Sequence, residues 1–264
     1  MSLSPTEITY RHADTDLYAV EHGDGPPVVL LHGGLATHLA CLAFAAPLAA
    51  AHRLVTPDLR ASGRSRARGP LGWDLFADDV LALLDHLGLA RAIVGGVSFG
   101  SGVAARFALR HPDRLAGLVL LTPVYPGADT PLDPAARAAM DAMAAAGRRA
   151  LTEGPAALHP LLAALPPDVQ ARARALFDTY DPESVAALTT FMASGAQPFA
   201  SAADLADITA PTLLVPGADP THPRWVAALY AQHLRDARVR DAEPGAWADL
   251  IAEAARAWSS CQLS

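Results

Sequence analysis

Hydrophobic positions along the chain alternate between short aliphatic runs and longer segments with helical spacing. Apolar runs bounded by turn residues predict strands over 8–11, 17–21, 28–31, 54–56, 93–94, 115–121, 211–215 and 237–240. Apolar residues at helical spacing predict helices over 74–87, 99–109, 224–234 and 247–258. This alternation is typical of the α/β class, in which a mostly parallel sheet is flanked by helices on both faces.

The segment 125–206 interrupts this alternation. It is rich in alanine and leucine and is divided by prolines, so it predicts short helices and no strand. An insertion between two strands of a parallel sheet lies near their carboxyl ends, where open α/β sheets bind ligands. We therefore expect a core formed by 1–124 and 207–264 with 125–206 as a helical lid. A structural excursion without a gating role is the alternative.

Composition excludes several classes of protein. The chain has 264 residues, 52% of them hydrophobic and 18% charged, which argues for a packed domain and against disorder. Its net charge of −7 includes no strongly basic stretch, so we expect no nucleic-acid partner. All basic residues are arginine and alanine is abundant, as expected of a GC-rich bacterial gene.

Other absences narrow the location and the chemistry. Cys41 and Cys261 lie far apart without metal-ligand spacing, so we expect no disulfide, no metal and no organic cofactor. Residues 1–13 lack the apolar run of a signal peptide. The stretch 25–52 carries no Asp, Glu or Arg, but prolines and glycines divide it, which does not suit a membrane helix. We expect a soluble cytoplasmic protein with no membrane association.

The sharpest chemical signal is Gly96-Val97-Ser98-Phe99-Gly100. It follows a predicted strand and opens a predicted helix. A serine on so tight a turn needs small neighbours, which Gly96 and Gly100 supply, and its hydroxyl then stands at the carboxyl edge of the sheet. The pattern in this setting indicates a nucleophilic serine.

With this motif and three others, the chain resembles the α/β-hydrolase superfamily over nearly its whole length. Leu30-Leu31-His32-Gly33-Gly34 is similar to the family's oxyanion loop. The segment 58–65, Asp-Leu-Arg-Ala-Ser-Gly-Arg-Ser, is similar to the family's Asp-x-Arg-Gly-x-Gly-x-Ser, with Ala61 in place of a glycine. The segment 211–219 is similar to the strand and loop that carry the catalytic acid.

The resemblance implies a role for each matching position. Ser98 would be the nucleophile, and the backbone N–H groups of Gly34 and Phe99 would form the oxyanion hole. Asp219 would orient a histidine and stabilise its charged form. In the family that histidine follows the last strand, where this chain reads Glu-Pro-Gly-Ala-Trp, so that Ala246 stands at the expected position of the base.

Three explanations of Ala246 remain open. It is a substitution in an engineered, inactive variant, which the intact flanking residues favour. Alternatively, the natural protein lacks the base and does not hydrolyse through Ser98. In the third explanation another histidine replaces it, and His222, three residues after Asp219, is the best candidate. We therefore expect this chain to be inactive or severely impaired in hydrolysis, because removal of the triad histidine in another serine hydrolase costs on the order of 10⁶ in kcat.

Further polar residues have weaker claims on the site. His32 is expected to hold the oxyanion loop by a local hydrogen bond, and His38 to lie near the pocket mouth. An arginine cluster over 60–68 is expected to pair with the acidic residues Asp74, Asp78 and Asp79. Steering of an anionic substrate is its alternative role.

The function that these residues favour is serine hydrolysis of a small apolar acyl compound through an acyl-enzyme on Ser98. An ester, lactone, thioester or carbon–carbon bond beside a ketone lies within the family's range. The apolar preference follows from the predicted lid, whose larger side chains are Met140, Met143, Phe177, Phe191, Met192 and Phe199. The alternative is a non-hydrolytic protein of the same fold, such as a cyclase, a lyase or a ligand-binding protein.

Overall fold

A computed structural model describes residues 5–67 and 69–261. In this part of the chain eight strands form a single sheet in the order β1-β2-β4-β3-β5-β6-β7-β8. The strands are β1 (Thr6–His12), β2 (Thr15–His22), β3 (Pro27–Leu31), β4 (Arg53–Pro57), β5 (Ala92–Val97), β6 (Leu115–Leu121), β7 (Thr212–Val215) and β8 (Ala237–Val239). The pairs β1–β2 and β2–β4 are antiparallel and all other pairs are parallel, so the carboxyl ends of β3 to β8 meet at one edge.

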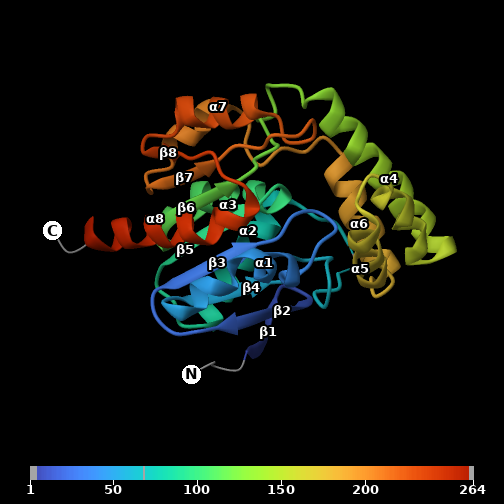
Figure 1. The fold of residues 1–264 in the computed structure, drawn as a ribbon, viewed down its shortest axis with the longest axis horizontal. Coiled ribbons are helices and arrows are strands. Elements are labelled where there is room, and N and C mark those ends of the chain that lie inside the picture. Colours follow the sequence, from blue (N-terminus) through green and yellow to red (C-terminus); the bar gives the residue numbers. More distant parts are fainter. Residues whose placement is uncertain (1–4, 68, 262–264) are drawn as a thin grey trace.

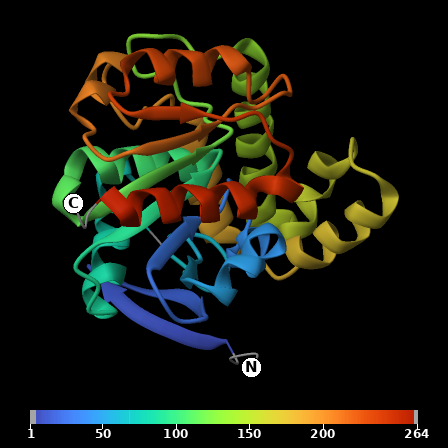
Figure 2. The same cartoon turned by 60° about the vertical axis from the view of Figure 1, so that its left-hand side comes forward.

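Helices cover both faces of this sheet (Figures 1 and 2). They are α1 (His38–Ala45), α2 (Trp73–His86), α3 (Phe99–Arg110), α4 (Pro134–Glu153), α5 (Pro167–Phe177), α6 (Pro182–Ala193), α7 (Arg224–His233) and α8 (Trp247–Cys261). Alternate residues of β3 point to opposite faces: Val29 and Leu31 pack in the core with α2, α3 and α7, whereas Val28 and Leu30 pack in the core with α1 and α8. The predicted α/β class with a mostly parallel, two-faced sheet is confirmed.

Most predicted elements are present with bounds shifted by a few residues, but α1 was not predicted. Its sequence, HLACLAFA, is apolar on every side, so it lacks the polar face that marks an amphipathic helix. Thr37 caps its N-terminus by accepting a hydrogen bond from the backbone N–H of Leu39. The helix lies in the charge-free stretch 25–52. Because its apolar residues show no helical period, the sequence pattern could not locate it.

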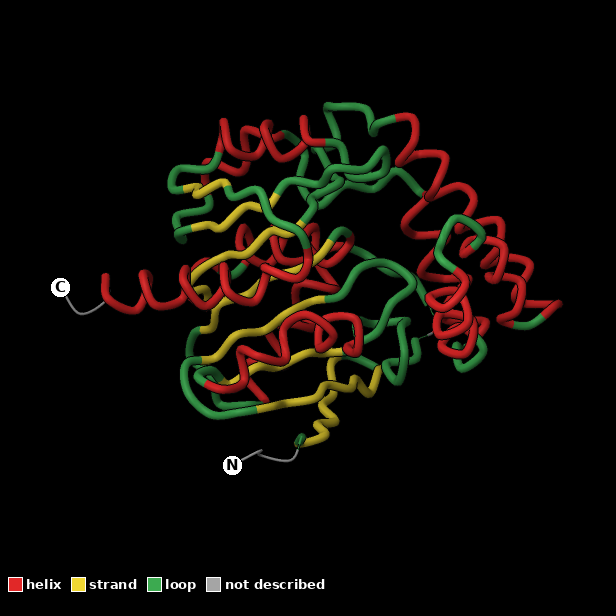
Figure 3. The backbone as a smooth tube through the Cα atoms, in the orientation of Figure 1, coloured by secondary structure: helices red, strands yellow, loops and turns green. Residues whose placement is uncertain are grey.

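The chain between β6 and β7 is helical, as the sequence predicts, and contains no strand among its residues. Helices α4, α5 and α6 stand together beyond the carboxyl edge of the sheet (Figures 1 and 3), and we call this segment the insertion. It has a small core of its own, formed by Ala146, Leu158, Leu162, Phe177, Tyr180 and Val185. Tyr180 links the insertion to the residue that follows the oxyanion loop: its hydroxyl donates a hydrogen bond of 2.9 Å to the Leu35 carbonyl oxygen.

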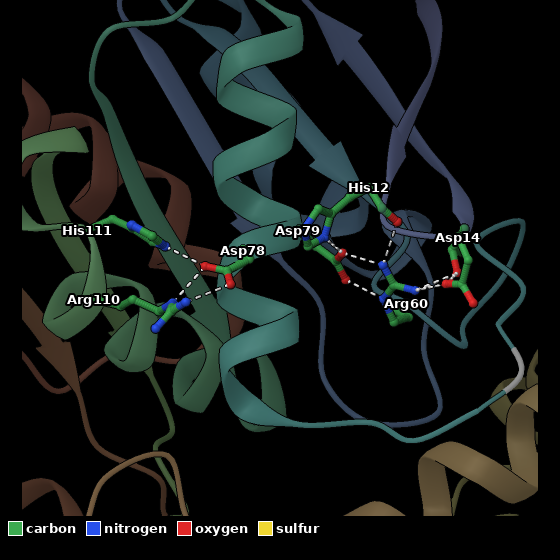
Figure 4. A network of polar contacts seen from close by, with 8 residues as sticks. His12, Asp14, Arg60, Asp78, Asp79, Arg110 and His111 are labelled. Carbon is green, nitrogen blue, oxygen red and sulfur yellow. Dashed lines mark hydrogen bonds and ion pairs between the residues drawn. The ribbon is translucent and has the colours of Figure 1, made fainter.

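Buried ion pairs fasten the start of the sheet to helix α2 (Figure 4). Arg60 is 3% exposed and donates to both carboxylate oxygens of Asp79, at 2.8 and 2.7 Å, while His12 contacts the same carboxylate. Asp78, the preceding residue of α2, pairs with Arg110 and His111. Arg60 therefore pairs with Asp79, as expected, and is enclosed in the fold. Elsewhere in the cluster the expected pairing is wrong, because Arg64 pairs with Glu7, and Asp74 and Asp78 pair with Arg106 and Arg110. Arg68 lies outside the described residues.

Among the residues that the structure describes, no helix is both long enough and apolar enough to cross a membrane.

Candidate active site

Ser98 occupies the turn between β5 and α3 in a backbone conformation that few residues adopt. Its φ of 52° and ψ of −112° lie outside the usual regions for a residue with a side chain. A Cβ atom at Gly96 would collide with the carbonyl of Gly100, and one at Gly100 would collide with the carbonyl of Leu31. The predicted strand–turn–helix setting and the need for two glycines are therefore observed.

The oxyanion loop lies directly beside Ser98. Gly34 lies close to the methyl group of Met192, so a larger residue at this position would require that side chain to move. Phe99 is the first residue of α3, and the first N–H groups of a helix have no partner within it. Gly34 and Ser98 line the same two cavities, so one of the two predicted oxyanion donors faces the same space as the serine.

His32 holds the oxyanion loop in place by hydrogen bonds. Its Nε2 accepts a hydrogen bond of 2.9 Å from the backbone N–H of Leu59, so its Nδ1 carries the proton and donates to the Gly33 carbonyl oxygen at 2.7 Å. The imidazole is 1% exposed, and burial lowers its pKa. Both ring nitrogens are thus engaged within the protein, which agrees with the local role expected for His32.

An imidazole stands beside the serine. His222 Nε2 lies 2.9 Å from Ser98 Oγ, and His222 Nδ1 lies 2.9 Å from Asp219 Oδ2. The carboxylate can only accept hydrogen bonds, so Nδ1 carries the proton and Nε2 is free to accept the Ser98 hydroxyl proton. Ser98, His222 and Asp219 therefore form a continuous line of hydrogen bonds.

A tight turn explains how one loop supplies both the acid and the imidazole. The Asp219 carboxylate accepts hydrogen bonds from the backbone N–H groups of Thr221 and His222, at 2.8 and 2.9 Å, and from the Thr221 hydroxyl. This local closure, typical of aspartate in turns, folds residue 222 back over residue 219. Pro220 and Pro223 restrict the backbone on either side of the turn.

The same contacts set the charge of the acid. Burial acts to raise the pKa of Asp219, but hydrogen bonds from Thr221 and His222 outweigh it and lower the pKa to about 2. The carboxylate is therefore ionised at neutral pH. An ionised acid at Nδ1 stabilises the imidazolium that forms when His222 takes a proton.

Position 246 has no such relation to the serine. Ala246 is exposed on the short turn Pro244–Ala246 before α8, and it is not among the residues that line the cavities at Ser98. The expectation that the base is missing therefore disagrees with the geometry. The imidazole beside Ser98 is that of His222, the candidate named in the third explanation of Ala246.

His38 lies apart from this line. Its Nδ1 contacts the buried carboxylate of Asp58 at 2.8 Å, and its backbone N–H donates to the same oxygen. Those hydrogen bonds outweigh burial and lower the pKa of Asp58. His38 thus fixes the start of α1 to the loop after β4, and it does not line the cavities at Ser98.

Two cavities meet at Ser98. The insertion-side cavity, of about 190 Å³, lies under α4 and α6 and is lined by Ser98, His222, Met140, Met143 and Met192. The central cavity, of about 560 Å³, is also lined by Ser98 and His222, and it extends toward Pro244 and Trp247. Ser98 is therefore reachable from two sides.

Only part of the insertion's large apolar side chains face the serine. The three methionines line the insertion-side cavity, whereas Phe191 packs on Trp73 and Phe76. Phe177 packs on Tyr180 inside the insertion, and Phe199 packs on Tyr230. The phenylalanines hold the insertion together and onto the core, so of these six side chains only the methionines shape this side of the cavity, together with Val124 and Tyr125. Within the described residues no cluster of three or more His, Cys, Asp or Glu side chains could hold a metal ion.

Comparisons with known proteins find similar sequences and similar folds. A family model described as alpha/beta hydrolase fold matches residues 26–162. RutD from Azorhizobium caulinodans, which is named as a carbamate hydrolase, is 30% identical over 257 residues. The match covers 91% of this chain and 92% of RutD. A proline iminopeptidase from Neisseria meningitidis is 38% identical over 112 residues, but the match spans only 35% of its length.

Solved structures extend the likeness over the whole fold. A thermophilic esterase from Thermogutta terrifontis superposes with a TM-score of 0.76 at 25% identity, covering 98% of each chain.

Proposed function

We propose that this chain, which belongs to the alpha/beta hydrolase fold family, is a serine hydrolase that uses Ser98, His222 and Asp219. It would act on a small apolar acyl compound such as an ester, lactone or thioester. The observation that carries the proposal is the hydrogen bond between Ser98 Oγ and His222 Nε2, with Asp219 behind the imidazole. Relatives named as a carbamate hydrolase and a proline iminopeptidase, together with the structurally similar esterase, support hydrolysis of a carbonyl compound.

The reaction follows from this geometry. His222 Nε2 takes the Ser98 hydroxyl proton as the oxygen attacks the substrate carbonyl carbon, and the N–H groups of Gly34 and Phe99 stabilise the resulting oxyanion. The imidazolium then gives its proton to the leaving group, which leaves an acyl group on Ser98. A water molecule, deprotonated by the same imidazole, releases the acid and restores the serine.

The non-hydrolytic alternative rested on the absence of a base. An imidazole within hydrogen-bond distance of Ser98 leaves that alternative without its main support. Carbon–carbon cleavage beside a ketone remains a related reaction of the same three residues. We rank ester and lactone hydrolysis ahead of it because the structurally similar esterase shares the whole fold.

Covalent labelling tests the proposal without knowledge of the substrate. We expect an alkyl fluorophosphonate to label wild-type protein at Ser98, as read by mass spectrometry, and Ser98→Ala to remain unlabelled. Ser101→Ala is the matched control, because this serine lies three residues away and its hydroxyl donates to the Ser98 carbonyl oxygen. If wild-type protein stayed unlabelled and did not turn over short-chain p-nitrophenyl esters, the result would contradict the proposal and favour the non-hydrolytic alternative.

A further inference from the structure

A third cavity lies beside Val97, the residue before Ser98, on the face of the sheet that α1 and α8 cover. We call it the α1 cavity. It measures about 570 Å³ and is bounded by α1, the end of β5 and the turn before α8, with Ala40, Ala43, Phe44, Gly245 and Trp247 among its lining residues. This volume falls in the range of small-molecule sites.

The α1 cavity adjoins the central cavity. Both are lined by Gly33, Val97, Pro244 and Trp247. Gly33 belongs to the oxyanion loop and Val97 directly precedes Ser98 in the chain, so the shared wall lies beside Ser98. A substrate bound at Ser98 can therefore extend into the α1 cavity through the central cavity.

The lining of the α1 cavity carries no net charge. It includes no Asp, Glu or Arg, and it belongs mainly to the stretch 25–52, which has no such residue anywhere. Its two titratable groups stay neutral, because burial raises the pKa of the Cys41 thiol and lowers the pKa of His32. The apolar surface continues outward along α1, where Leu39 is 52% exposed. Only an apolar group gains from burial in such a cavity.

The position of the base keeps this route open. His222 approaches Ser98 from the loop after β7, and the turn after β8, with Ala246 exposed, carries no imidazole. Pro244, Gly245 and Trp247 are thereby available as a cavity wall. Trp247 is held edge-on against Phe44, with ring centroids 5.1 Å apart, which fixes the far side of that wall.

From this shared wall and the uncharged lining we propose that the α1 cavity binds an unbranched hydrocarbon chain of the substrate, while the insertion-side cavity holds the substrate's smaller part. The proposal rests on the proposed function, because it assigns a second arm of the molecule that Ser98 attacks. The chain can belong to the acyl group or to the alcohol of an ester. Each methylene that it buries should raise kcat/KM about fourfold, from the usual transfer free energy of such a group.

Chain-length profiles test the proposal. In the acyl arm of the experiment the acyl group varies, in p-nitrophenyl esters from acetate to dodecanoate. In the alcohol arm the alcohol varies, in alkyl acetates from methyl to decyl, and hydrolysis is measured by the release of acid. Ala43→Phe fills the α1 cavity from an exposed helical position, and Ala139→Phe fills the insertion-side cavity. Ala46→Phe is the matched control, because Ala46 is exposed nearby and lines none of these cavities.

We expect kcat/KM of wild-type protein to rise with chain length in one arm. Ala43→Phe should lower it by at least tenfold for the longest productive chains and leave the two-carbon ester unchanged, while Ala46→Phe retains the full profile. The arm that responds identifies the acyl group or the alcohol as the source of the chain. A profile that Ala139→Phe shortens and Ala43→Phe leaves intact would overturn the proposal. Turnover of the short esters that survives Ser98→Ala would instead contradict the proposed function itself.

Discussion

The loops after β7 and β8 lie side by side at the carboxyl edge of the sheet but differ in their chemistry. The loop after β7 carries Asp219 and His222, joined to each other and to Ser98 by hydrogen bonds. The loop after β8 has no histidine, and its turn at Pro244–Ala246 forms a wall of two cavities instead. Under the proposed function, the comparison teaches that one tight turn can provide both acid and base, which frees the neighbouring loop for substrate binding.

The largest effect should follow removal of the imidazole. We expect His222→Gln to lower kcat by a factor on the order of 10⁶, as loss of the triad histidine does in another serine hydrolase. His233→Gln serves as a control, since this histidine ends α7 and lines none of the cavities at Ser98. Steady-state rates with a short p-nitrophenyl ester measure both. A loss of less than tenfold would mean that the base comes from elsewhere.

The second effect sharpens the role of the acid in the same loop. Asp219→Asn keeps the shape of the side chain but removes the charge that orients and stabilises the imidazolium, so kcat should fall about 10⁴-fold. Because the amide oxygen of the substituted side chain could still accept from the N–H groups of the turn, we expect little change in KM or in the thermal midpoint. A marked fall in the thermal midpoint together with the fall in kcat would indicate that the residue only shapes the turn.

The insertion should affect the oxyanion loop more weakly. Tyr180→Phe removes the hydrogen bond to the Leu35 carbonyl oxygen, next to Gly34, which costs about 1 kcal/mol for a typical bond of this kind. We expect kcat to fall about three- to tenfold with KM nearly unchanged. Tyr230→Phe, which removes a similar bond to the Tyr125 carbonyl oxygen, should lower stability comparably and leave kcat unaltered.

The smallest effect concerns the charge of Asp219. Its pKa is lowered from 3.8 to about 2 in the folded protein, so its contribution to stability is fully present above about pH 4 and is lost as the pH falls toward 2. The difference in unfolding free energy between wild type and Asp219→Asn should therefore shrink over that interval. The side chain is 56% exposed, so this difference is small even at neutral pH. Urea titrations between pH 2 and 6 measure it, and a difference that grows on acidification would contradict the assigned pKa direction.

Periodicity and turn chemistry were sufficient to predict the sheet, most of the helices and the strand–turn–helix that holds Ser98. These features are local: Ser98 needs two nearby glycines, and each strand is a short aliphatic run. Helix α1 could not be predicted, because a helix that is apolar on all sides has no period to detect. For the same reason the α1 cavity had no sequence signal beyond a stretch without charge.

The base was the hardest residue to assign from sequence. Family order directs attention to Ala246, after the last strand, whereas the structure brings His222 to Ser98 across 124 positions of the chain. The local signal was the arrangement Asp-Pro-Thr-His-Pro over residues 219–223, since an aspartate in such a turn folds the following residues back over its carboxylate. A spacing of three residues between acid and histidine indicates that they meet, but their distance to the serine depends on the fold.

Restoring a histidine at position 246 tests the central claim most directly. We would compare kcat/KM for a short p-nitrophenyl ester among wild type, Ala246→His, His222→Gln and the double variant. If the base belongs to the loop after β7, wild type is active, Ala246→His changes the rate by less than tenfold, and it does not rescue His222→Gln. If Ala246→His instead gains several orders of magnitude and His222→Gln loses little, the base belongs to the loop after β8 and the account is wrong.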